Sequence, residues 1–182
     1  MTSSEGPTGR LFLAVPLPGR MAHSLKLLAS RLEKEFPGRY VPETNYHVTL
    51  AFIGEAPLRL AEDLGPFLRE TAAAFPPVPV SFSTLGFFGS ARSAILWAVL
   101  ENGSVLLPLA EAVRSGLQKR GVSFDRKAVR PHITIARKVD LQDAALPALP
   151  EAQGTRDTLT LYHSTRVQGR LTYMPLVQAS LG

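Results

Sequence analysis

One pattern occurs twice in the chain and restricts its fold more than any other feature. Residues 47–51 read His-Val-Thr-Leu-Ala, and residues 132–136 read His-Ile-Thr-Ile-Ala. Both copies are rich in β-branched and aliphatic residues, which is typical of strands. Because side chains alternate between the two faces of a strand, the pattern predicts that His47, Thr49 and Ala51 share one face, opposite an aliphatic face.

In the second copy, the face of the histidine also includes the residue two positions upstream. Alternation there groups Arg130, His132 and Thr134 on one face. The two histidines stand 85 residues apart, close to half of the 182-residue chain, which indicates an internally duplicated architecture. Two such strands facing each other would direct two imidazoles and two hydroxyls at one substrate group.

A third His-x-Thr match, His163-Ser164-Thr165, is predicted to lie outside this site. In that segment Leu159, Leu161 and His163 fall on the same face. The imidazole therefore continues an apolar row, whereas His47 and His132 oppose one. We interpret the third match as a chance occurrence at a strand end.

The remaining pattern predicts an α+β fold of mainly antiparallel sheets in two lobes with outer helices. Apolar periodicity predicts helices over 19–36, 58–74 and 105–117, the second interrupted at Gly65-Pro66 because an interior proline costs about 3 kcal/mol. The predicted strands cover residues 10–17, 46–54, 78–84, 94–100, 131–136, 158–167 and 170–177. Residues 1–9 are expected to form a flexible leader, and residues 141–150 a proline-rich connector.

Two further segments carry candidate substrate contacts. Gly86-Phe87-Phe88-Gly89 is predicted to be a glycine-bounded loop, in which Phe87 and Phe88 either stack on a base or belong to the core. A basic cluster of Arg126, Lys127 and Arg130 directly precedes the second histidine strand. Together with the net charge of +5, the cluster favours a polyanionic partner.

Composition narrows the class of protein. With 45% hydrophobic and 19% charged residues the chain is typical of a soluble globular protein. The absence of cysteine excludes disulfides, thiolate nucleophiles and cysteine zinc sites. No segment approaches the roughly 18 apolar residues of a membrane span, and the start lacks the apolar run of a signal peptide. We therefore expect a cytoplasmic protein that does not engage membranes.

Two histidines can divide one displacement at phosphorus between them. An unperturbed imidazole has a pKa near 6.5, so one ring can accept a proton from the attacking oxygen while the other donates one to the departing oxygen. Thr49 and Thr134 can bind the non-bridging phosphate oxygens, and Arg130 can balance their charge. This chemistry needs no metal or other cofactor. Neither a His-Glu-x-x-His zinc pattern nor a Gly-x-Ser-x-Gly nucleophile elbow occurs in the chain.

At these residues the chain resembles the 2H phosphoesterases, and among them the RNA 2′,3′-cyclic phosphodiesterases, also called 2′-5′ RNA ligases. The resemblance runs from Arg10-Leu11-Phe12-Leu13-Ala14, through both His-x-Thr segments and residues 86–100, to the terminal segment with Tyr173. It implies one domain over residues 1–182, whose two lobes are related by a pseudo-twofold with the active-site groove between them. It also implies that His47 donates a proton to the leaving oxygen and that His132 accepts one from water, a direction that the residues alone leave open.

The implied reaction is hydrolysis of an RNA or nucleotide 2′,3′-cyclic phosphate to a 2′-phosphomonoester, by a monomer. Two alternatives remain open from the sequence. One is the joining of 2′-5′ linked RNA ends, because the same two histidines can run the step in reverse. The other is an RNA- or nucleotide-binding module without turnover, although phosphate binding alone needs only Arg and Lys and not paired histidines.

Overall fold

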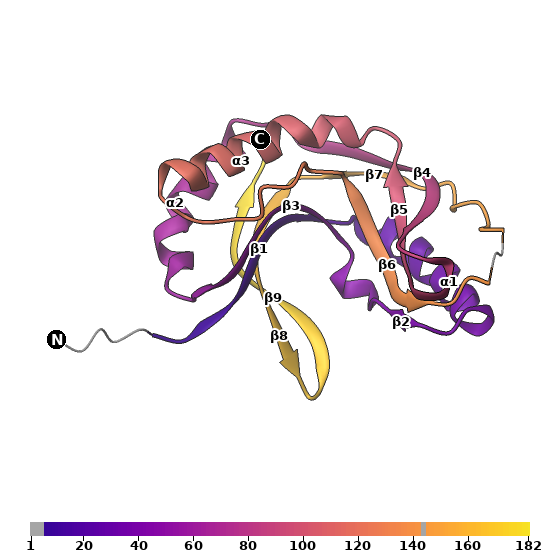
Figure 1. Ribbon diagram of the computed structural model, residues 1–182. Helices are drawn as coiled ribbons and strands as arrows, with labels where there is room; N and C mark the ends of the chain where they lie inside the picture. The colour runs from indigo at the N-terminus through magenta and orange to yellow at the C-terminus, as the bar shows by residue number, and fades with distance from the viewer. Residues whose placement is uncertain (1–5, 143–144) are drawn as a thin grey trace.

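Two antiparallel sheets form the framework of the protein, seen here in a computed structural model that describes residues 6–142 and 145–182 (Figure 1). The first sheet has the strand order β3-β1-β8-β9, and the second has the order β2-β6-β5-β4-β7. The strands are β1 (Thr8–Pro16), β2 (Arg39–Tyr40), β3 (His47–Pro57), β4 (Val78–Phe88), β5 (Ala94–Leu100), β6 (His132–Val139), β7 (Gln153–Arg156), β8 (Thr158–Val167) and β9 (Arg170–Ser180). The predicted α+β class with antiparallel sheets is confirmed.

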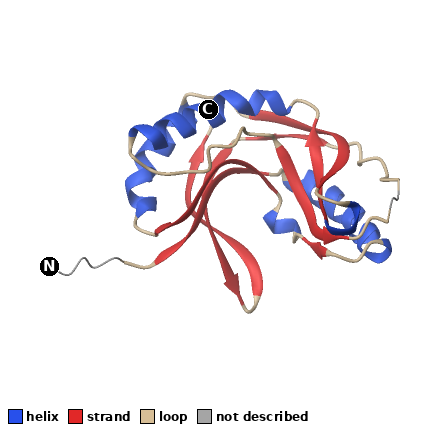
Figure 2. Cartoon of the chain, viewed as in Figure 1, coloured by secondary structure: helices blue, strands red, loops and turns tan. Residues whose placement is uncertain are grey.

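Three helices cover the outer faces of the sheets (Figure 2). They are α1 (Gly19–Glu35), α2 (Leu60–Ala73) and α3 (Leu107–Lys119). Helices α2 and α3 touch each other and pack on the first sheet through β9 and β3, whereas α1 contacts β7 of the second sheet. None of the helices in the described ranges is long and apolar enough to cross a membrane.

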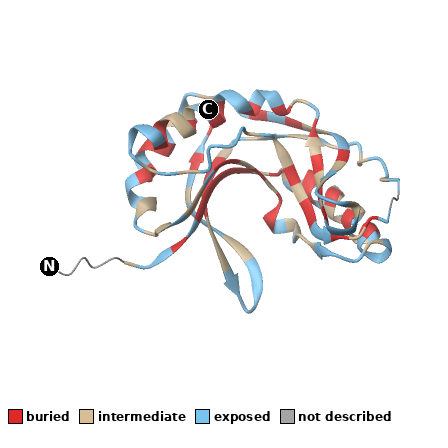
Figure 3. Ribbon diagram, in the orientation of Figure 1, coloured by how far each residue is buried: buried red, intermediate tan, exposed pale blue. Residues whose placement is uncertain are grey.

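Burial follows the helical and strand periodicities of the sequence (Figure 3). Met21, Leu25 and Leu32 line the buried side of α1 at spacings of four and seven residues, about one and two helical turns. In β5 the alternation is complete, since every second residue from Ala94 to Leu100 is buried. Buried residues of both sheets and all three helices belong to one contiguous apolar cluster, so the two sheets share a core.

Strand β3 contains a bulge directly after its His-x-Thr segment. Opposite β1, the register jumps from Thr49 to Ala51, which leaves Leu50 as an extra residue. The prediction that Ala51 shares the face of His47 and Thr49 is therefore wrong: Ala51 is 3% exposed and belongs to the core. The next residue, Phe52, is turned onto the face that carries His47.

Strand β6 contains a bulge at the equivalent position. Opposite β5, the register jumps from Thr134 to Ala136, which leaves Ile135 as the extra residue. Ala136 is consequently fully buried in the core, and Arg137 is turned onto the face that carries His132. The duplication suggested by the sequence thus extends to the local geometry of the two strands.

Several predicted boundaries need correction. The leader is shorter than expected, because Thr8 and Gly9 already belong to β1, while residues 1–5 lie outside the described residues. Helix α2 continues through Pro66 without interruption, since the burial of Leu64 and Leu68 offsets the lost hydrogen bond. The short strands β2 and β7 were not predicted. The described part of the 141–150 connector has no helix or strand, and residues 143–144 lie outside the described residues.

The glycine-bounded loop at 86–89 is a further correction. Strand β4 runs on to Phe88, so both phenylalanines are strand residues paired with β5. Only Gly89 turns the chain, with a φ of 86° that favours glycine. The hairpin predicted over β8 and β9 is present, with its turn at Gln168-Gly169.

Candidate active site

His47 is the first residue of β3 and is held by two hydrogen bonds. Its Nδ1 lies 2.7 Å from the carbonyl oxygen of Asn45, and its Nε2 lies 3.0 Å from Oγ1 of Thr49. A carbonyl only accepts, so Nδ1 carries the proton in the neutral ring. The Thr49 hydroxyl then donates to Nε2, the nitrogen left with a free lone pair.

His132 is the first residue of β6 and repeats this arrangement in the second sheet. Its Nδ1 donates to the carbonyl of Arg130, two residues upstream, at 2.5 Å. Both imidazoles are therefore held in the same tautomer by the same local contact, which leaves the lone pair of each ring on Nε2. Strands β3 and β6 touch each other where the two sheets meet, and the charge of His132 acts on His47. We call the side of the sheets that bears these two rings the histidine face.

An aromatic cage of Phe12, Tyr162 and Tyr173 surrounds His47. The centroid of the imidazole lies 4.9 Å from that of Phe12, and Tyr173 meets the imidazole edge-on at 5.2 Å. Phe12 and Tyr162 lie directly opposite each other on β1 and β8 and stack at 5.3 Å. The cage is a small apolar cluster separate from the main core.

The cage changes the acidity of His47. Burial is the largest of the effects that lower the pKa of His47 from 6.5 to about 4; the positive charges of His132 and Arg137 contribute to the fall, and the hydrogen bond to Asn45 opposes it. Since burial penalises the charged form, His47 is neutral at pH 7 in the free protein. The ring can take up a proton more readily once an anion sits beside it.

Two aromatic rings flank His132. Phe88 and Trp97 stack on each other with centroids 4.8 Å apart, and each meets the imidazole edge-on, at 5.8 and 5.6 Å. Trp97 lies opposite Gly86, where an added Cβ would come within 2.9 Å of the indole. Gly86 therefore leaves the space that the indole needs to reach this position.

The two phenylalanines predicted to stack on a base or belong to the core, Phe87 and Phe88, point to opposite faces of the second sheet. Phe88 contacts His132, but Phe87 lies opposite the fully buried Leu96 and so points to the other side of the sheet. The ring that sequence reasoning missed is Phe52, which the β3 bulge brings opposite Phe12. Phe52 is 36% exposed, and the guanidinium of Arg10 lies 5.5 Å from its centroid.

Arg137 supplies a cation that acts on His47 and was not predicted. Arg130 is exposed, and its carbonyl holds His132. The charge of Arg137 acts on both His47 and Tyr173: burial raises the pKa of Tyr173, and Arg137 and Arg10 oppose that rise. Arg137 stands five residues after His132, and the bulge at Ile135 explains why simple alternation did not find it.

Asn45 links His47 to β9 through two hydrogen bonds and was not predicted from the sequence. Its side chain is 5% exposed and donates from Nδ2 to the carbonyl of Leu171 on β9, at 3.0 Å. Its own carbonyl holds His47. One residue thus fixes the imidazole and anchors the strand that carries Tyr173.

His163 lies apart from the other two histidines, as predicted, but in the middle of β8 and not at a strand end. It pairs with Leu11 on β1 and shares the core face of the first sheet with Leu161. Its ring occupies the space over Gly9, where an added Cβ would clash with it. Within residues 6–142 and 145–182, no three His, Asp or Glu side chains are grouped closely enough to hold a metal ion.

The fold and the site define a protein with two antiparallel sheets and a duplicated His-x-Thr strand. The sequence model of the 2′-5′ RNA ligase superfamily matches residues 18–168. The chain belongs to this superfamily.

Two curated relatives similar to this chain are both named RNA 2′,3′-cyclic phosphodiesterase. An RNA 2′,3′-cyclic phosphodiesterase of Thermotoga maritima is 31% identical over 130 residues, which cover 70% of this chain and 69% of the relative. Another, of Geobacillus stearothermophilus, is 33% identical over 147 residues, covering 78% of this chain. This chain spans 47% of the Geobacillus relative, about half its length.

Solved structures of the same kind share the fold. Escherichia coli LigT complexed with 3′-AMP matches with a TM-score of 0.77 and 27% identity, covering 96% of this chain and 99% of LigT. The protein TT0787 of Thermus thermophilus also has a TM-score of 0.77 and 27% identity, covering 94% and 97% of the two chains. The resemblance noted from the sequence is confirmed at the level of fold and family.

Proposed function

We propose that this protein hydrolyses RNA or nucleotide 2′,3′-cyclic phosphates to 2′-phosphomonoesters. The single observation that carries the proposal is the pair of imidazoles held in one tautomer on two touching strands, each with its lone pair on Nε2. The curated relatives carry the corresponding name, and LigT structures with 3′-AMP and ATP support binding of a nucleotide.

The reaction assigns one proton transfer to each ring. Nε2 of His132 takes a proton from water as its oxygen attacks phosphorus, and the bond from phosphorus to the 3′-oxygen breaks. Nε2 of His47 donates a proton to that 3′-oxygen, which leaves a 2′-phosphate and a 3′-hydroxyl. The rings exchange their protonation states in the process, so they must be reset through solvent before the next turnover. No step needs a metal ion.

The phosphate would be held by the remaining polar groups of the histidine face. Thr134 lies two residues after His132 and can donate its hydroxyl to a non-bridging oxygen. The Thr49 hydroxyl donates to Nε2 of neutral His47, and it can turn to a non-bridging oxygen once that nitrogen is protonated. Arg137 contributes the balancing charge, since its field already reaches His47. Arg130, which the sequence places on the face of His132, is a second candidate for that charge, and its carbonyl also holds His132.

The low pKa of His47 constrains the direction of proton transfer. A ring with a pKa of about 4 is almost entirely unprotonated at pH 7 in the free protein, so it has no proton to donate. The anionic cyclic phosphate beside Nε2 stabilises the imidazolium and raises this pKa. His47 can therefore act as the acid only in the complex with substrate, where the phosphate anion compensates for the apolar cage.

Phe52 is the best candidate for stacking on a substrate base. Its ring is exposed on the histidine face, and the planar guanidinium of Arg10 lies 5.5 Å from the ring centroid. Phe88 and Trp97 form the corresponding wall beside His132.

The test is incubation of the purified protein with an oligonucleotide ending in a 2′,3′-cyclic phosphate, in excess EDTA. We expect a 2′-phosphate end at the same rate with and without the chelator. A protein that binds the oligonucleotide without forming product would be a binding module. Complete loss of turnover on chelation would contradict the two-histidine mechanism.

The joining of 2′-5′ linked RNA ends is the second candidate activity. It uses the same atoms in reverse, because the ring that protonates a leaving oxygen can deprotonate that oxygen as a nucleophile. Offering a second RNA with a free hydroxyl and quantifying both products decides between the two, and we expect hydrolysis to dominate. A single domain, a monomer and a cytoplasmic location remain predictions, the first two testable by limited proteolysis and by size-exclusion chromatography with light scattering.

A further inference from the structure

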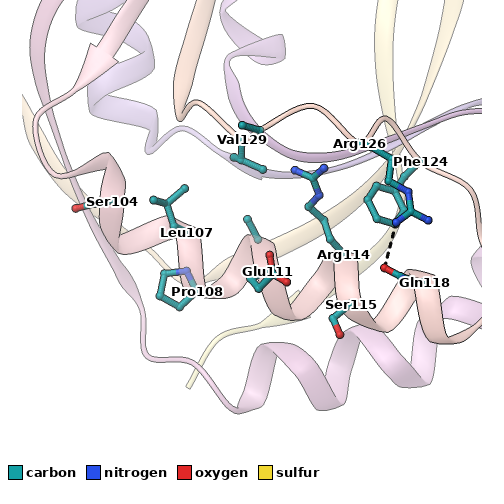
Figure 4. Close-up of a pocket in the computed structure, with 12 residues that line it drawn as sticks. Ser104, Leu107, Pro108, Glu111, Arg114, Ser115, Gln118, Phe124, Arg126 and Val129 are labelled. Carbon is teal, nitrogen blue, oxygen red and sulfur yellow. Dashed lines mark hydrogen bonds between the residues drawn. The ribbon is translucent and has the colours of Figure 1, made fainter.

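A pocket of about 790 Å³ lies apart from the two histidines, between α3 and the segment 124–129 that leads to β6 (Figure 4). Its walls are partly apolar, with Leu107 and Val129, and partly polar, with Ser115 and Gln118. Neither catalytic histidine lines it. The basic cluster noted in the sequence contributes Arg126 to this pocket.

Two arginines flank Phe124 at one end of the pocket. The guanidinium groups of Arg114 and Arg126 lie 5.1 and 5.0 Å from the centroid of Phe124. Each also donates one hydrogen bond, Arg114 to the carbonyl of Asp125 and Arg126 to Oε1 of Gln118. These contacts hold both planar groups in place, which lowers the entropy cost of binding a further acceptor.

Neither arginine has its charge neutralised. In the described part of the chain, no carboxylate lies within 4.0 Å of either guanidinium. Glu111 lines the same pocket, but Figure 4 shows it on the Pro108 side of Arg114, away from Arg126. The Arg114–Arg126 end therefore carries two positive charges with free donors, which suits the oxygens of a phosphate.

The pocket borders the edge of the histidine face. The backbone N–H of Asp125 donates to the carbonyl of Phe52 at 2.8 Å, so the segment that carries Phe124 and Arg126 runs along the free edge of β3. Phe52 lies five residues along β3 from His47, opposite Phe12 on β1. A strand of RNA that extends past Phe52 would next meet this basic edge.

We propose that Arg114 and Arg126 bind a backbone phosphate of the RNA strand upstream of the cyclic end. The proposal rests on the proposed function and defines its substrate class: the protein prefers an RNA several nucleotides long over a cyclic mono- or dinucleotide. Neither histidine lines the pocket, and the segment that carries Arg126 runs along the edge of β3 at Phe52, so the two arginines would contact the RNA chain upstream of the terminal nucleotide. The net charge of +5 agrees with a polyanionic substrate that is held at more than one phosphate.

The test compares kcat/KM for a dinucleotide and for a twelve-nucleotide RNA, both with a 2′,3′-cyclic phosphate. We expect the long substrate to be preferred by the unaltered protein. In Arg114→Gln and Arg126→Gln the kcat/KM of the long substrate should fall about tenfold, the effect of one charged hydrogen bond, with the dinucleotide unchanged. The salt dependence of log kcat/KM for the long substrate should become shallower by about 0.7 per lost phosphate contact.

A matched control is Arg31→Gln, which removes an exposed charge from α1 on the other side of the molecule and should change neither substrate. An equal loss on both substrates in Arg126→Gln would mean that the segment acts only through His132, and would overturn the proposal. Equal rates for both lengths in the unaltered protein would also overturn it. If no cyclic end is hydrolysed, the proposed function fails, but the pocket can still be tested by the fluorescence anisotropy of a labelled twelve-nucleotide RNA with a 3′-phosphate. The arginine variants should bind this RNA about tenfold more weakly than the unaltered protein. Unchanged binding would refute the proposed phosphate site.

Discussion

The aromatic cage should control the protonation of His47, and replacement of Tyr173 tests this directly. With a pKa of about 4, roughly one free molecule in a thousand carries a charged His47 at pH 7, against about one in four for an ordinary imidazole of pKa 6.5. Tyr173 closes one side of the cage edge-on at 5.2 Å. In Tyr173→Ala, water reaches the imidazole, so the pKa of His47 should rise from about 4 toward 6.5. Titration followed by histidine NMR signals, assigned with His47→Gln, measures both values.

The same pKa makes stability depend on pH. Between about pH 6.5 and 4 the unfolded chain binds a proton at His47 that the folded chain does not. The free energy of unfolding should therefore fall as the pH falls through this window, by up to about 1.4 kcal/mol per pH unit from this group. Urea unfolding at pH 7 and pH 5 should show this loss in the unaltered protein, and a smaller loss in His47→Gln.

Phe88→Ala is the matched control, since it removes a ring beside His132 and leaves the cage intact. It should not move the pKa of His47. An unaltered protein in which His47 titrates near 6.5 would refute the reasoning. So would a Tyr173→Ala variant that remains folded with the pKa of His47 unchanged.

The remaining predictions concern the division of work among the polar groups. His47→Ala and His132→Ala should each lower kcat by at least about 10²-fold, as measured by single-turnover kinetics. The double variant should be little slower than either single variant, because in the proposed mechanism the two rings act as one catalytic unit. Thr49→Ala and Thr134→Ala should each cost about 10- to 100-fold in kcat/KM, the loss of a hydrogen bond to a charged group, and equal losses to the histidine variants would assign them a proton transfer. His163→Ala should leave the chemical step unchanged in a folded protein, and an equal loss there would extend the site to the third motif.

Much of the fold follows from periodicity alone. Strand β5 and helix α1 were located almost to the residue, because each has one uninterrupted buried face. The strands β2 and β7 were missed because they are two and four residues long, too short for alternation to be visible. Their positions depend on pairing with β6 and β4, which is a tertiary contact and not a local pattern.

The site was predictable as far as the first bulge. Up to Thr49 and Thr134 simple alternation holds, and the histidines and threonines share their faces as expected. Beyond them the extra residue reverses the alternation, which moves Ala51 into the core and brings Phe52 and Arg137 to the histidine face. A bulge leaves no distinct signal in a run of aliphatic residues, since either register buries an apolar side chain.

The two bulges also explain how a duplicated motif can serve an asymmetric reaction. Each places the residue five positions after its histidine on the histidine face, and that residue is Phe52 in one strand and Arg137 in the other. The aromatic cage around His47 destabilises its charged form, and the cation from the other strand adds to that effect. A bound phosphate reverses both, because it supplies an anion to the imidazolium and to Arg137 at once. In the proposed reaction, His47 is neutral in the free protein and becomes charged when the cyclic phosphate binds, so the substrate itself would generate the acid.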